Sequence, residues 1–71
     1  MSERVFYMKE VYDAAAQRLQ VLPLMGEDAL ISHVVATTEE IKSRNRAHDI
    51  LQKLVEAGFL YQPRPRLYAL L

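Results

Sequence analysis

Residues 47–71 of the chain, AHDILQKLVEAGFLYQPRPRLYALL, decide the fold that we expect. Apolar residues at helical spacing lead up to Gly58, which accepts the left-handed backbone conformation in which helices commonly end. These apolar positions are Ala47, Leu51, Leu54 and Val55. Two short apolar runs follow, at 59–61 and 67–70, on either side of a basic segment with two prolines. The order predicts a helix, a glycine stop and a β-hairpin with a charged tip.

Two further helices are expected upstream. Residues 3–20 carry apolar side chains at three- and four-residue steps around three consecutive alanines, which favour helix. A second apolar set extends from 27 to 37 behind two acids suited to a helix N-terminus. The predicted buried positions are Val5, Met8, Tyr12, Ala15 and Leu19 in the first helix and Ala29, Leu30 and Val34 in the second, with Ile31 and Val35 as further candidates. Between the helices Pro23 interrupts an apolar run, 21–24, which is therefore an edge strand or an extended linker.

The start of the third helix has two interpretations. Thr37 and Glu40 have the spacing of a capping box, whereas Ser43 offers an N-cap further along the chain. In either case the helix is expected to end at Ala57. The elements together predict one α+β domain over residues 1–71, with three helices, a C-terminal hairpin and a candidate third strand before the second helix.

The composition excludes several classes of protein. The 71 residues are 51% apolar, which allows one small core, and they include no cysteine for disulfides or thiolate metal sites. The apolar runs are far shorter than the roughly 20 residues of a membrane span. The N-terminal residues lack the apolar core of a signal peptide. We therefore expect a soluble, cytoplasmic protein without a membrane partner.

The charges are unevenly distributed although the formal net charge is zero. Residues 1–40 hold three bases and seven acids, whereas residues 41–71 hold six bases and two acids. A domain with this polarity can place its basic side on phosphate while its acidic side stays in water. The charge pattern is therefore compatible with nucleic-acid binding by the C-terminal part.

The order of helix, glycine, strand, charged turn and strand resembles the end of a winged helix-turn-helix domain. Residues 43–47, SRNRA, resemble the start of the recognition helix in that superfamily, where short polar and basic residues precede the first core position. Such a helix start reads bases with arginine and asparagine and holds phosphate with serine. The DNA contacts that the resemblance implies here are Lys42, Ser43, Arg44, Asn45, Arg46 and His48. The alternative is a solvated polar turn in which Ser43 only caps the helix.

The tip of the predicted hairpin, 62–66, supplies a second candidate contact. Pro63 and Pro65 remove backbone donors and stiffen the tip, so Arg64 and Arg66 are presented at low entropic cost. Winged-helix proteins commonly direct an arginine of the wing to the minor groove or its phosphates, which implies that role here. The alternative is that the prolines only protect an exposed strand edge from aggregation.

Residues 58–71 are also similar to the tail of the winged-helix domain of archaeal minichromosome maintenance helicases, a run of the type G-x-I-Y-E-P-R-P-G-Y. The matching positions are Gly58, Tyr61, Pro63, Arg64 and Pro65, and Tyr68 stands one position after the final tyrosine of that run. Gln62 replaces the glutamate of that run and Arg66 replaces its second glycine. In that family the domain regulates the motor and has no catalytic activity of its own.

The sequence offers little for catalysis. His33 and His48 are the two histidines, and each lies on a predicted helix beside apolar neighbours. His48 and Asp49 are adjacent, so their side chains are expected to diverge on the helix and to form no relay. With two glycines the chain has no glycine-rich phosphate loop. We therefore predict a protein that is not an enzyme and has no metal site and no cofactor.

The last feature of the sequence is a surplus of apolar residues in the first helix and the hairpin. The first helix is apolar over more of its face than one packing stripe requires, so it either packs tightly or forms a homodimer interface. The residues of that interface would be Val5, Met8 and Tyr12. In the hairpin, at least two of the three aromatic residues at 59, 61 and 68 are expected to cover the helices rather than stack on single-stranded bases.

The leading hypothesis is binding of double-stranded DNA by a small regulator of transcription or replication. Because small domains seldom reach useful affinity alone, a homodimer or a larger complex is expected. The alternative is a winged-helix module for protein interaction, which the zero net charge and the acidic first half favour. Convergence of the basic side chains on one surface favours DNA, whereas scattering or pairing with acids favours a protein partner.

Overall fold

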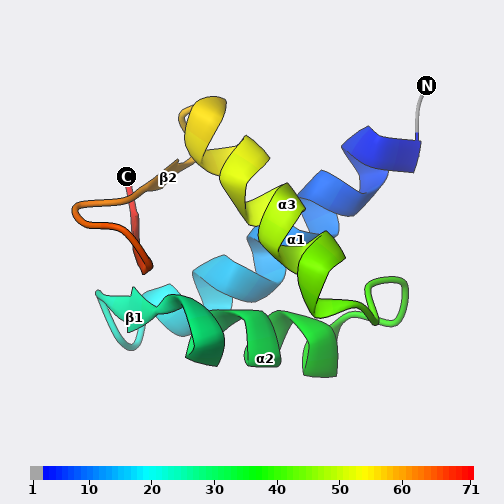
Figure 1. Ribbon diagram of the computed structural model, residues 1–71, viewed down its shortest axis with the longest axis horizontal. Coiled ribbons are helices and arrows are strands. Elements are labelled where there is room, and N and C mark those ends of the chain that lie inside the picture. The colour runs from blue at the N-terminus through cyan, green and yellow to red at the C-terminus, as the bar shows by residue number, and fades with distance from the viewer. Residues whose placement is uncertain (1–2) are drawn as a thin grey trace.

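The computed structural model describes residues 3–71, and the side chains of residues 7–71. Its elements are α1 (Glu3–Leu19), β1 (Met25–Gly26), α2 (Glu27–Thr37), α3 (Arg44–Glu56), β2 (Leu60–Tyr61) and β3 (Leu67–Leu70). The helices pack against one another around one core, and the strands lie at the end of the bundle where α1 ends and α2 begins (Figure 1). Within the described residues the predicted α+β architecture of three helices and a C-terminal hairpin is confirmed.

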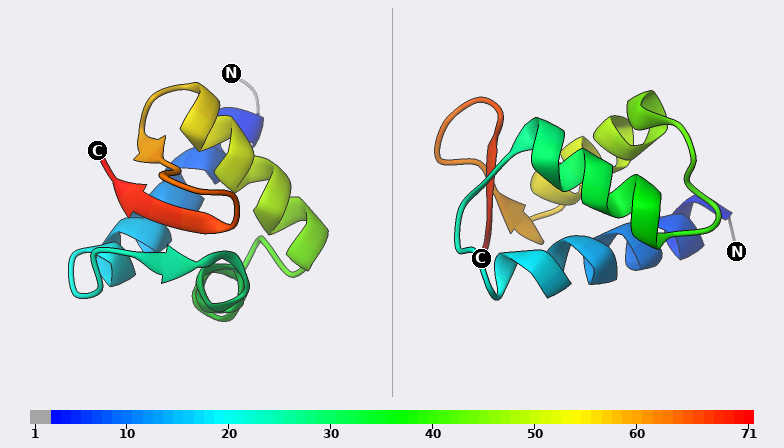
Figure 2. Two further views of the ribbon diagram at one scale, coloured as in Figure 1. Left: turned by 60° about the vertical axis from the view of Figure 1, so that its left-hand side comes forward. Right: turned by 90° about the horizontal axis from the view of Figure 1, so that it is seen from below.

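The strands form one antiparallel sheet in the order β1-β3-β2, so the last strand of the chain is the central one (Figure 2). β1 pairs with the first half of β3, with Met25 opposite Tyr68. β2 pairs with its second half, with Leu60 opposite Leu70. Because β1 leads directly into α2 and β2 follows α3, these two pairings attach the hairpin to both helices and keep its loop beside them.

The third strand lies later in the chain than expected. Residues 21–24 form a turn, in which the N–H groups of Val21 and Leu22 donate to the Arg18 carbonyl at 3.0 and 2.8 Å. Pro23 cannot donate to a strand ladder because it has no N–H. The prediction of a strand at 21–24 is therefore wrong in position, and β1 begins immediately after this turn.

Hydroxyl groups cap both helices at the two ends of the α2–α3 connection. Thr37 is the last residue of α2 and Thr38 its C-cap, with the Thr38 hydroxyl donating to the Val34 carbonyl at 2.8 Å. The Ser43 hydroxyl accepts from the Arg46 N–H at 3.3 Å, which makes Ser43 the N-cap of α3. The start at Ser43 is confirmed, and the capping-box start at Thr37 is wrong because that threonine belongs to the preceding helix.

Two described residues have a positive φ, and only one of them is a glycine. Gly58 has φ 87° just after α3, as its place in the sequence predicts. Arg66 has φ 68° at the end of the hairpin loop, and its carbonyl accepts from the Glu27 N–H at 2.8 Å. A side chain in this region costs roughly 1–2 kcal/mol, so the loop holds Arg66 in a strained conformation.

Replacing Arg66 with glycine is therefore expected to raise the free energy of unfolding by about 0.5–1 kcal/mol. This figure is the relieved strain minus the stabilisation that glycine's greater conformational freedom gives to the unfolded chain. The matched change Gly58→Ala is expected to lower it by about 1 kcal/mol. An added Cβ at Gly58 would meet no atom within 4 Å, so that cost is conformational rather than steric. Urea denaturation of the three proteins measures both effects, and a less stable Arg66→Gly protein would contradict the strain.

The core draws side chains from every helix and from the hairpin. Its largest fully buried members are Tyr68, Leu30, Ile41, Leu51, Leu54, Leu60, Val11 and Val34. α1 contributes Val11, Ala15 and Leu19, which confirms the last two as predicted core residues. Met8 and Tyr12 are only partly buried, at the edge of this stripe. One apolar edge of α1 therefore remains accessible.

Other expectations about apolar residues need correction. Ala29 is exposed rather than buried. The side chain of Val5 lies outside the described residues. Among the aromatic residues of the hairpin Tyr68 is buried, while Phe59 and Tyr61 are 55% and 52% exposed. The Phe59 ring still packs edge-on against Tyr12 of α1, and Tyr68 contacts α2 and α3, so two of the three rings lie against the helices as predicted.

Candidate nucleic-acid interface

α3 and the hairpin loop 62–66 border one groove of about 560 Å³. Its lining consists of Glu27 at the start of α2, His48 and Gln52 on α3, and all five residues of the loop. We call it the α3–loop groove, and the left view of Figure 2 shows the loop alongside α3. The fold thus brings the two segments singled out in the sequence to one surface.

A hydrogen-bond network centred on Tyr68 fixes the loop to the helices. The Gln52 amide donates to the Tyr68 hydroxyl at 2.7 Å and lies 3.5 Å from the side-chain oxygen of Gln62. The Tyr68 hydroxyl donates to the Glu27 carboxylate at 3.3 Å. At the other end of the loop, the Glu27 N–H holds the Arg66 carbonyl. Burial, with a contribution from the charge of Glu27, raises the pKa of Tyr68 above its usual 10.0.

His48 stands between two carboxylates at the mouth of the groove. Its Nε2 lies 3.6 Å from Oε1 of Glu27, and its Nδ1 lies 3.7 Å from Oδ1 of Asp49. The expectation that His48 and Asp49 diverge is therefore wrong, because both exposed side chains bend toward each other. Neither distance is that of a hydrogen bond. The arrangement allows ion pairs when the imidazole is protonated, and it shows no proton relay.

Arg44 is turned toward α2. Its Nη1 donates to the Ser32 hydroxyl at 2.8 Å, and its Nη2 lies 3.3 Å from both the carbonyl and the carboxylate of Asp28. The ion pair is exposed, with the Asp28 side chain 98% accessible. Such a pair contributes roughly 0–1 kcal/mol, so it orients Arg44 without locking it.

Two other predicted contacts are directed to other elements. The Arg46 guanidinium lies over the Tyr7 ring of α1, 4.9 Å from its centroid. Lys42 donates to the Thr38 carbonyl at the end of α2, at 3.2 Å. Arg44, Arg46 and Lys42 therefore point to three different neighbours and do not converge on the α3–loop groove.

The remaining predicted residues are placed as follows. Arg64 and Arg66 are exposed at the groove, and among the described residues neither side chain makes a hydrogen bond or an ion pair. Asn45 is exposed near the start of α3. The hydroxyl of Ser43 is occupied by the N-cap bond. The structure thus assembles His48, Arg64 and Arg66 in one place.

Sequence reasoning missed the polar residues that organise this groove. Gln52 lies one turn after His48 on α3, a spacing that places both on one face and could have indicated it. Glu27 and Gln62 gave no such signal, because their contacts to α3 arise only when the chain folds. The two carboxylates at the start of α2, Glu27 and Asp28, also reduce the excess of positive charge that residues 41–71 carry.

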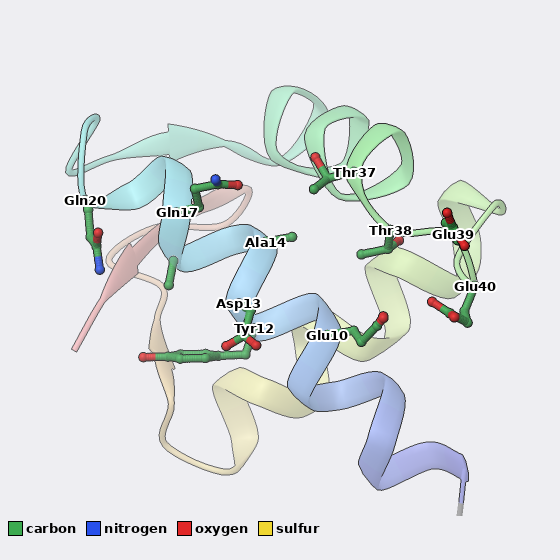
Figure 3. A pocket seen from close by; sticks show the side chains of 11 residues that line it. Glu10, Tyr12, Asp13, Ala14, Gln17, Gln20, Thr37, Thr38, Glu39 and Glu40 are labelled. Carbon is green, nitrogen blue, oxygen red and sulfur yellow. The ribbon is translucent and has the colours of Figure 1, made fainter.

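A second, acidic groove of about 730 Å³ lies between α1 and the α2–α3 connection (Figure 3). Its carboxylates are Glu10, Asp13, Glu39 and Glu40. A hydrogen bond with Glu40, followed by desolvation and the nearby negative charges, raises the pKa of Glu10. In the described part of the chain, no group of three or more histidine, cysteine, aspartate or glutamate side chains is arranged to hold a metal ion.

Comparisons with protein-family models, with curated proteins and with solved structures found no match to this chain. Of the helices that the structure describes, none is both long and apolar enough to cross a membrane. Any functional assignment therefore depends on the residues of the chain and on the geometry of its grooves.

Proposed function

We propose that this chain is a winged-helix domain that binds double-stranded DNA, without catalysis or a cofactor, as a cytoplasmic regulator of transcription or replication. The observation that carries the proposal is the α3–loop groove, where the unpaired Arg64 and Arg66 lie beside the polar face of α3. The element order α1-β1-α2-α3-β2-β3 with a central last strand supports the same assignment. α3 then enters the major groove and the loop contacts the adjacent backbone or minor groove.

The proposal refines the set of contacts. Asn45, His48 and Gln52 share one face of α3 by their spacing, and amide and imidazole groups suit base edges. Arg64 and Arg66 reach phosphates from the loop. Four of these five residues line the α3–loop groove, and Asn45 extends the helix face by about one turn toward the start of α3. The surface thus offers two kinds of contact, as a helix flanked by a wing requires.

Arg44 joins this surface if its exposed contacts with Asp28 and Ser32 open; the exposed ion pair among them contributes only roughly 0–1 kcal/mol. Arg46 and Lys42 have secondary roles in the proposal because they are held against Tyr7 and Thr38. Arg66 has a positive φ at the position where the helicase run has a glycine, which supports the resemblance to the helicase tail.

Fluorescence anisotropy with mixed duplex DNA at two salt concentrations tests the proposal. The Arg64→Ala variant is expected to weaken binding to all sequences and to lower the salt slope by about 1, because one phosphate contact is lost. Arg44→Ala is expected to relax sequence preference, at about 1–3 kcal/mol for one base pair. Arg18→Ala on α1 is the matched control, because Arg18 is exposed away from the α3–loop groove, and it is expected to bind like the parent. Absence of binding at low salt, or equal binding by all four proteins, contradicts DNA binding.

The second candidate function is a protein-interaction module within a larger complex. It is favoured by the scattering of Lys42, Arg44 and Arg46 onto groups of the chain itself, and by the carboxylates beside the α3–loop groove. Protein interfaces tolerate this mixture of charges, whereas phosphate is repelled by it. Failure to bind any duplex at low salt is the result that favours this candidate.

A further inference from the structure

The hydrogen bonds around Tyr68 determine which groups of the α3–loop groove face a ligand as donors and which as acceptors. An ionised carboxylate can only accept, so the Tyr68 hydroxyl donates its proton to Glu27, at 3.3 Å. The hydroxyl must therefore accept from Gln52, whose amide nitrogen lies 2.7 Å away. The second N–H of this amide faces the side-chain oxygen of Gln62 at 3.5 Å. Both donors of Gln52 are thus directed to the chain itself.

Two acceptors remain for a ligand on the helix side of the groove. Among the described residues, no group donates to the side-chain oxygen of Gln52, and the Glu27 carboxylate keeps lone pairs besides the one that the Tyr68 hydroxyl uses. Both side chains line the groove, and that of Glu27 is 21% exposed. We call these two groups the acceptor wall. The loop side has the opposite chemistry, because the guanidinium groups of Arg64 and Arg66 donate and cannot accept.

Cytosine is the base whose major-groove edge fits the acceptor wall. It presents its N4 amino group as a donor, next to a C5–H group that is not an acceptor. Adenine also presents an amino group, but its N7 acceptor lies beside it and would face an oxygen of the wall. Guanine and thymine present acceptors, which would lose their water without gaining a hydrogen bond. Gln52 cannot read adenine bidentately either, because that contact needs an amide N–H as well as the oxygen.

We propose that the α3–loop groove reads a cytosine in duplex DNA, with Glu27 and Gln52 accepting from its N4 amino group while Arg64 and Arg66 hold the neighbouring phosphates. The inference rests on the proposed DNA binding and adds the base that the groove selects. It also gives a role to the carboxylate of Glu27, which repels phosphate and would otherwise only weaken binding. Tyr68 is a positioning residue, because its hydroxyl turns the oxygen of Gln52 outward.

Selection from a random-sequence duplex pool, followed by fluorescence anisotropy on the selected duplex, tests the proposal. The parent is expected to select C·G at one position and to lose affinity about tenfold when that pair becomes T·A. Replacing only that cytosine with pyrimidin-2-one, which lacks the amino group, is expected to cause a similar loss. Binding without such a position, or without an effect of the amino group, overturns the inference and leaves DNA binding standing. Absence of binding to the pool overturns both.

The Glu27→Gln variant separates base reading from charge. The new amide keeps an oxygen for the Tyr68 hydroxyl, and the backbone N–H that holds Arg66 is unchanged. Its amide nitrogen can donate to O4 of thymine or N7 of adenine. The variant is therefore expected to bind every duplex more tightly, since a negative charge is lost, and to discriminate C·G from T·A less than about threefold.

Asp49→Asn is the matched control, because it neutralises the other carboxylate beside His48, 3.7 Å from its Nδ1, and Asp49 does not line the groove. It is expected to tighten binding to all duplexes and to keep the tenfold discrimination of the parent. A Glu27→Gln protein that still discriminates about tenfold overturns the proposal, as does an Asp49→Asn protein that loses discrimination to the same extent.

Discussion

Replacing Ile41 with alanine is expected to lower the free energy of unfolding by about 2–4 kcal/mol, the usual cost of a cavity left by a fully buried isoleucine. Ile41 lies in the connection between α2 and α3 and is 0% exposed. Its backbone carbonyl lies 3.4 Å from the Thr38 hydroxyl, which holds the connection in place. Because a domain of this length has a total stability of roughly 4–10 kcal/mol, the change removes a large part of it.

Urea denaturation followed by circular dichroism measures this effect. The matched control is Val21→Ala, which shortens an exposed side chain in the other long connection and is expected to change the stability by less than about 0.5 kcal/mol. A cost below about 1 kcal/mol for Ile41→Ala would mean that the connection does not contribute to the core in solution.

Ile41 also shows where prediction from sequence ends. It is a single apolar residue within a polar run, 37–46, so no periodicity marks it as buried. By contrast, the stop at Gly58 and the ends of α2 follow from strong local signals and were predicted closely. The choice between Thr37 and Ser43 could not be made from the sequence, because both offer a hydroxyl cap; in the fold Thr37 belongs to α2, Ser43 caps α3, and Ile41 between them is buried.

The same distinction applies to the candidate interface. Arg64 and Arg66 were predicted correctly as exposed residues of a hairpin tip, because proline and charge patterns act locally. The attachment of Arg44 to α2 was not predictable, since Asp28 and Ser32 are distant in sequence and are brought close only by helix packing. The surface that a helix presents therefore depends on its neighbours as well as on its own residues.

Replacing Tyr68 with phenylalanine is expected to cost about 1–2 kcal/mol of stability, although the aromatic ring is kept. The ring is fully buried at the centre of the sheet, and its hydroxyl connects the Gln52 amide to the Glu27 carboxylate. Without the hydroxyl both groups lose a partner inside the α3–loop groove. Tyr61→Phe is the matched control, because Tyr61 is half-exposed on the neighbouring strand, and it is expected to have little effect.

The loss caused by Tyr68→Phe should also depend on pH. Burial and the charge of Glu27 raise the pKa of Tyr68 in the folded protein, so the folded state keeps a proton that the unfolded chain loses near pH 10.0. The stabilisation from the hydroxyl is therefore complete below that pH and declines as the pH rises above it. Urea denaturation at several values between about pH 8 and pH 11 should show the parent and Tyr68→Phe converging at the alkaline end. A difference that stays constant, or a variant as stable as Tyr61→Phe, would contradict the bridging role of this hydroxyl and with it the fixed position of the loop.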